Sequence, residues 1–136
     1  MVDDILLNKT AIIERCLKRI EEEYLGHESE LESDFTRQDS IVLNLQRACE
    51  AAIDAAMHLV RVHRLGVPQS SRDAFVLLEK SGRLIPDLGA SMQSMVGFLN
   101  VAVHAYQELS MTILRSILES RLDDFRRFSS WLIASQ

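Results

Sequence analysis

The sequence is poor in glycine, proline and cysteine, residues that are abundant in many all-β, disordered or disulfide-bonded proteins. Of its 136 residues, five are glycine, two are proline and two are cysteine. So few turn-forming residues argue against an all-β fold and against a disordered chain. The cysteines, Cys16 and Cys49, fall within helical patterns and share no CxxC spacing, so we expect reduced thiols in a core. A chain of this length can bury a core without disulfides or a structural metal.

Membrane and metal signatures are also missing from the sequence. No apolar run reaches 18 residues, and the acidic start Met1-Val-Asp-Asp lacks the layout of a signal peptide. We therefore expect a cytoplasmic protein that does not enter a membrane. His58 and His63 are five residues apart, a spacing that does not bring them onto one helix face, so we expect no metal site. The sequence contains no glycine-rich phosphate loop and no convincing nucleophilic triad.

The charge is negative overall but unevenly distributed. Twenty acidic and fifteen basic residues give a net charge of -5, which by itself disfavours binding to nucleic acid. Residues 21–39 hold eight of the acids and one base, whereas the rest of the chain has fourteen bases and twelve acids. Two interpretations remain open for this acidic segment. It is either a solvated connector between helices or a surface for a basic partner.

Apolar residues recur with helical spacing along most of the chain. The pattern predicts long helices over residues 4–24 and 39–63, the second ending with Gly66 as its cap, and a fourth helix starting near residues 86–87. It predicts a short third helix capped by Ser70 or Ser71, and two further helices over residues 111–118 and 121–133, with Ser120 and Asp123 as a capping pair between them. We therefore expect residues 1–136 to form a single all-α domain, a four-helix bundle with additional short helices.

Polar side chains gather late in the predicted fourth helix. At about 100° per residue, Asn100 and His104 lie on one face and one turn apart, and Tyr106 follows where the helix is expected to end. Imidazole suits proton transfer near neutral pH, an amide can orient it, and a phenol can donate a hydrogen bond or accept a transferred group. Taken alone, each residue also fits a structural role, with the histidine exposed and the tyrosine packed.

The segment from Met95-Val-Gly-Phe98 to Tyr106 resembles the HepT toxins of the HEPN superfamily. Their signature reads Arg-Asn-x-x-x-His-x-Tyr, and here Asn100, His104 and Tyr106 match it. The resemblance extends to the opening helix and to residues 38–52, 66–75 and 122–128, so it covers nearly the whole chain.

The resemblance implies an HEPN-type bundle and a homodimer whose two motifs face each other across a cleft. HepT proteins are regarded as metal-independent endoribonucleases that cut mRNA or tRNA. The resemblance gives His104 the role of general acid or base and Asn100 an orienting role, with no cofactor. It also implies a partner, a minimal nucleotidyltransferase (MNT) antitoxin, which uses ATP to attach AMP to Tyr106.

The sequence departs from the family signature at Leu99, where the motif has arginine. Leucine cannot stabilise developing negative charge, so we expect impaired cleavage. Leu99 also fits the apolar stripe beside Met95 and Val96. Whether the leucine is natural or engineered stays open, as does compensation by Arg61, Arg64 or Arg72. The alternative function is a catalytically inactive HEPN dimer that binds a nucleotide or the antitoxin.

Overall fold

The computed structural model describes residues 3–104 and 110–135, with residues 101–104 described by their backbone only. The described residues form six α-helices and one short 3-10 helix, and no strand occurs among them. The elements are α1 (Asp4–Tyr24), η1 (Glu28–Glu30), α2 (Phe35–Val62), α3 (Ser71–Lys80), α4 (Pro86–His104), α5 (Met111–Ser120) and α6 (Leu122–Ala134). The all-α prediction is confirmed, and α1 spans the residues predicted for it.

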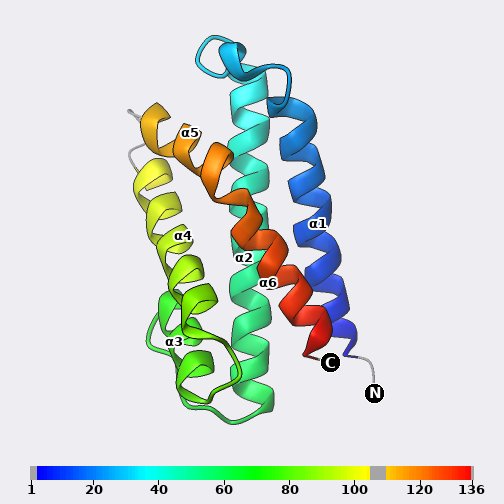
Figure 1. The fold of residues 1–136 in the computed structure, drawn as a ribbon, viewed down its shortest axis with the longest axis vertical. Helices are drawn as coiled ribbons and strands as arrows, with labels where there is room; N and C mark the ends of the chain where they lie inside the picture. Colours follow the sequence, from blue (N-terminus) through cyan, green and yellow to red (C-terminus); the bar gives the residue numbers. More distant parts are fainter. Residues whose placement is uncertain (1–2, 105–109, 136) are drawn as a thin grey trace.

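The long helices stand side by side around α2 (Figure 1). Helix α1 runs antiparallel to α2 on one side, α4 lies on the other, and α5 and α6 cross diagonally over α2. Helix α5 ends at Ser120 and α6 begins at Leu122, so together they make the fourth long arm of the bundle. This is the predicted architecture of four long helices with a short helix, α3, inserted before α4.

Helix α2 has the composition of a central helix. Five alanines on it are buried, and small side chains let neighbouring backbones approach closely. The helix contacts α1, α3, α4 and α6. The buried alanines are Ala48, Ala51, Ala52, Ala55 and Ala56. The core also contains Cys16 and Cys49, which are both buried, as predicted.

The ends of α2 differ from the prediction for a local reason at each end. The helix begins at Phe35, four residues early, because the Asp34 carboxylate caps it by accepting from the Arg37 backbone N–H at 3.1 Å. Gly66 was wrongly predicted as the C-terminal cap. The helix ends at Val62, and Arg64 adopts the left-handed conformation with φ of 54°.

The turn between α5 and α6 does not use the predicted capping pair. Arg121 is the N-cap residue of α6 and makes no side-chain capping bond, so the prediction for Ser120 and Asp123 was wrong. Packing holds α6 instead: Phe128 is fully buried and meets the edge of the Phe75 ring at a centroid distance of 5.6 Å.

Arginines from within the chain engage the acidic segment. Arg37 Nη1 donates to the Glu23 carbonyl at 2.8 Å, and Arg115 Nη2 donates to the Glu32 carboxylate at 2.8 Å. Arg126 pairs with Glu21. These contacts join the connection between α1 and α2 to α5 and α6, so part of the segment's negative charge is offset inside the chain.

Candidate functional site

The C-terminal half of α4 has one face in the core and one outside it. Met92, Met95 and Leu99 are buried, with at most 5% of any of them exposed, whereas Asn100 is exposed. Helical spacing places residues 97 and 104 on the side opposite these core positions, with residue 100 beside them. We call the side that carries residues 97, 100 and 104 the outer face of α4.

The predicted site residues are only partly within the described structure. Asn100 lies on α4 and His104 is the last residue of that helix, one turn later, but the side chain of His104 lies outside the described part. Tyr106 lies outside the described residues altogether. The structure thus brings Asn100 and the backbone of His104 onto one turn of helix.

Leu99 belongs to the core rather than to the outer face of α4. It is 5% exposed and packs in the same apolar cluster as Met95 and Val96. The expectation that Leu99 fits the apolar stripe is confirmed. A side chain at this position points toward the interior of the bundle and not in the same direction as Asn100.

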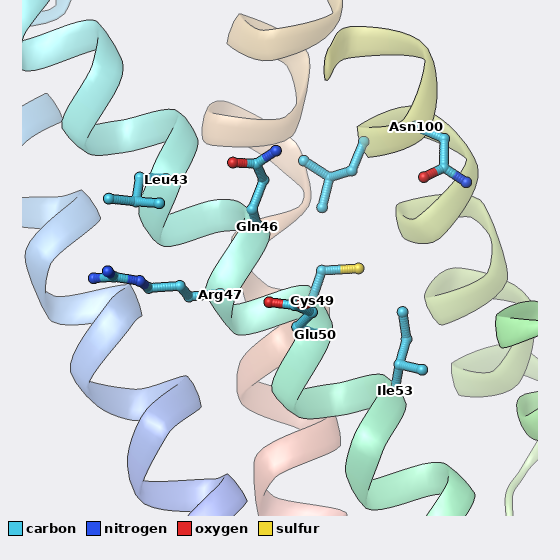
Figure 2. Close-up of a pocket in the computed structure, with 8 residues that line it drawn as sticks. Leu43, Gln46, Arg47, Cys49, Glu50, Ile53 and Asn100 are labelled. Carbon is cyan, nitrogen blue, oxygen red and sulfur yellow. The ribbon is translucent and has the colours of Figure 1, made fainter. Parts of the chain in front are cut away.

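A pocket of about 400 Å³ separates α2 from the end of α4. Figure 2 shows Cys49 and Ile53 extending from α2 toward α4, whereas Arg47 extends to the other side of α2, toward α1. Leu99 and Asn100 supply the α4 wall. The α2 wall consists of Leu43, Gln46, Arg47, Cys49, Glu50 and Ile53. We call this cavity the α2–α4 pocket.

The thiol in the α2–α4 pocket is unsuited to nucleophilic chemistry. Burial, with a smaller contribution from Glu50, raises the pKa of Cys49 to about 12. At neutral pH the side chain is therefore a neutral thiol, and the thiolate is the nucleophilic form. Cys49 acts here as a small apolar residue.

Sequence reasoning missed a group of arginines beside this pocket. Arg47 also lines a second cavity of about 320 Å³, together with Arg15 and Arg19 from α1. None of these three arginines forms an ion pair with the residues that the structure describes. The spacing of Arg15 and Arg19 indicated a shared helix face, but only the packing of α1 on α2 brings Arg47 to it.

His58 on α2, one of the two histidines considered as metal ligands, has a structural partner. His58 Nε2 lies 2.7 Å from the Asp3 carboxylate, and this hydrogen bond lowers the pKa of Asp3. Asp3 also caps α1 through the backbone N–H groups of Ile5 and Leu6. Within residues 3–104 and 110–135 no cluster of three or more potential metal ligands is found.

No helix in the described part of the chain has the length and hydropathy needed to cross a bilayer.

Comparison with known proteins gives consistent matches over nearly the whole chain. Residues 13–131 match the family described as ribonuclease HepT-like. The chain is 48% identical over 127 residues to the mRNA nuclease HepT of Shewanella oneidensis, covering 93% of this chain and 95% of that protein.

Solved structures agree with this match. The tri-AMPylated Shewanella oneidensis HEPN toxin in complex with MNT antitoxin superposes with a TM-score of 0.90 at 46% identity, covering 99% of this chain and 100% of that one. A toxin–antitoxin complex with AMP-PNP gives a TM-score of 0.90 at 45% identity, covering 96% and 99% of the two chains.

Proposed function

The chain belongs to the ribonuclease HepT-like family, and from this premise we propose that it is the toxin of a HepT/MNT toxin–antitoxin module in the cytoplasm. Its activity is endonucleolytic cleavage of mRNA or tRNA without a metal ion or other cofactor of its own. The observation that carries this proposal is the 48% identity over 93% of the chain to an mRNA nuclease. The polar outer face of α4 is the reaction surface.

The chemistry follows from the residues on this face. The 2′-hydroxyl of the RNA attacks the adjacent phosphate, which breaks the bond to the 5′-oxygen of the next nucleotide and leaves a cyclic phosphate. His104 exchanges a proton with the attacking or leaving oxygen, a task suited to imidazole near neutral pH. Asn100, one turn earlier, orients the histidine or the phosphate through its exposed amide.

At Leu99 the chain lacks a charged group that the proposed reaction needs. The family motif has arginine there, and arginine binds phosphate by two parallel hydrogen bonds while it neutralises charge. Leu99 is buried and apolar, so it cannot contribute to the transition state. We therefore propose that cleavage by this chain is slow.

The active form is a homodimer in which the outer faces of α4 meet across a shared cleft. One apolar side chain available for this contact is Leu43 on α2, which is 44% exposed and lines the α2–α4 pocket together with Asn100. Exposed aliphatic side chains of this kind can form part of the core of a homodimer interface.

The partner is an MNT antitoxin, which transfers AMP from ATP to Tyr106. Each AMP brings negatively charged phosphate to the place where RNA phosphates bind, so modification blocks the substrate by repulsion. Support comes from the similar toxin whose structure is AMPylated and bound to MNT antitoxin.

Tyr106 is expected to accept AMP from the antitoxin even though Leu99 replaces the motif arginine, because the acceptor hydroxyl is retained. Intact-mass measurement after incubation with the cognate antitoxin and ATP should show the addition of one or more AMP units. Tyr106→Phe should show none, and Tyr24→Phe, which removes the other tyrosine, should be modified normally. Equal modification of Tyr106→Phe and the unaltered chain would refute the assignment.

Incubation of the purified chain with cellular RNA in excess chelator tests the enzymatic function. We expect slow cleavage that persists in the chelator, because the reaction uses the hydroxyl of the RNA and no metal. Cleavage that stops when the chelator is added would contradict the metal-independent mechanism.

A second candidate function is favoured by Leu99 itself. A dimer without the motif arginine can bind the antitoxin or a nucleotide and cleave nothing. This binding-module function predicts RNA that stays intact in the same assay with the unaltered chain.

A further inference from the structure

We propose that Arg72, which comes from α3, is a phosphate-binding residue beside the outer face of α4. It holds the RNA backbone next to the cleavage position. This inference rests on the proposed function, and it names a residue outside the Asn100–Tyr106 motif. It concerns substrate binding and leaves the transition-state role of the motif arginine unfilled.

The position of the Arg72 side chain is the first observation. Arg72 lies in the first turn of α3, just after the Ser70 cap, and is exposed. Its Nη1 atom lies 3.9 Å from the point that a Cβ atom at Gly97 would occupy. The guanidinium group thus rests against α4 although it comes from another helix.

The position of Gly97 on α4 shows how far the Arg72 guanidinium group lies from the proposed reaction site. It lies on the outer face of α4, three residues before Asn100 and seven before His104. At a rise of about 1.5 Å per residue, it is about 5 Å from the level of Asn100 and about 10 Å from that of His104. Because glycine has no side chain, nothing at position 97 projects between the guanidinium group and the helix.

Arg72 is also free to bind an anion. It forms no ion pair or hydrogen bond with any residue in the described part of the chain, whereas Arg37, Arg115 and Arg127 all pair with carboxylates. A guanidinium group has five N–H donors in a planar fork that matches a phosphate group. An unpaired, exposed guanidinium group therefore keeps these donors available for the phosphates of RNA.

The distance along α4 defines the role of this arginine. A group about 10 Å from the level of His104 contacts a phosphate neighbouring the one that is cleaved. Such a contact is equally strong in the ground state and in the transition state, so it lowers KM and leaves kcat unchanged. Arg72 therefore strengthens RNA binding but does not replace the charge missing at Leu99.

Binding of a non-cleavable RNA isolates this contribution from catalysis. The probe is a fluorescent single-stranded oligonucleotide with 2′-O-methyl groups, titrated by anisotropy at several salt concentrations. Arg72→Ala should weaken binding by about tenfold, as expected for the loss of one charge-assisted contact, and should make the salt slope shallower by about 0.7. Arg72→Lys should fall between Arg72→Ala and the unaltered chain, because it keeps the charge but loses the fork.

Arg83→Ala is the matched control, since Arg83 is exposed, forms no ion pair with the described residues and precedes α4 at the opposite end from Asn100. It should bind RNA like the unaltered chain. If Arg72→Ala matches Arg83→Ala in affinity and salt slope, the inference is wrong while the proposed function stands. If the unaltered chain binds no RNA, the proposed function and the inference both fail.

Discussion

Leu99→Arg is expected to raise the rate of RNA cleavage by about 10²–10³-fold. Removing a single preorganised group that stabilises transition-state charge typically costs this factor, so restoring one should recover it. The gain should appear in kcat, because the added charge acts on the phosphorane that forms in the transition state. Initial rates on one RNA substrate measure it directly.

The structure shows how an arginine can be accommodated at position 99. Leu99 is almost fully buried, but it lines the α2–α4 pocket of about 400 Å³, which has Glu50 on its opposite wall. The aliphatic part of an arginine can take the place of the leucine while the guanidinium group extends through this pocket toward Asn100, which lines the same wall. Replacing a core leucine by a charged residue should also lower the unfolding temperature.

Two further substitutions at position 99 separate charge from packing. Leu99→Met keeps the apolar volume and should leave the cleavage rate unchanged. Leu99→Lys adds a charge without the planar fork and should recover less activity than arginine. A folded Leu99→Arg protein that cleaves no faster than Leu99→Met would show that the leucine does not limit the reaction.

His104→Ala is expected to reduce cleavage by about 10²–10⁴-fold when it is made in the more active Leu99→Arg protein. This is the usual contribution of a positioned general acid or base. By helical spacing His104 lies on the side of α4 opposite the buried residues, so its replacement should change the unfolding temperature little. His63→Ala, at the C-terminal cap of α2, removes a histidine from another part of the fold and should keep the full rate. Equal losses in the two variants would point to a general effect of removing a histidine.

The helices were predictable because their signals are local. The apolar spacing and the Asp3 cap define α1, and its bounds match the prediction. Helix α2 begins earlier than predicted because Asp34 caps it, and the exposed Phe35 at its start lies outside the apolar stripe on which the prediction rested. At the end of α2, Arg64 adopts the left-handed conformation that glycine usually fills, so the glycine at position 66 indicated the wrong residue for the cap.

The candidate site was predictable in part, for the same reason. The one-turn spacing of Asn100 and His104 and the burial of Leu99 follow from the helical period of α4 alone. The placement of Arg72 against Gly97, and of Arg47 between two cavities, depends on how α3 and α1 pack on the bundle. Contacts between residues far apart in sequence leave no periodic signal, so the positions of these arginines could be found only from the structure.

The most direct test of α4 as the reaction surface compares two proteins, Leu99→Arg and Leu99→Arg/His104→Ala, on the same RNA in excess chelator. We expect the first to cleave rapidly and to leave 5′-hydroxyl and 2′,3′-cyclic phosphate ends, and the second to be slower by about 10²–10⁴-fold. Equal rates for the two proteins, or products with 3′-hydroxyl ends, would contradict a mechanism in which His104 moves the proton and the RNA supplies the nucleophile.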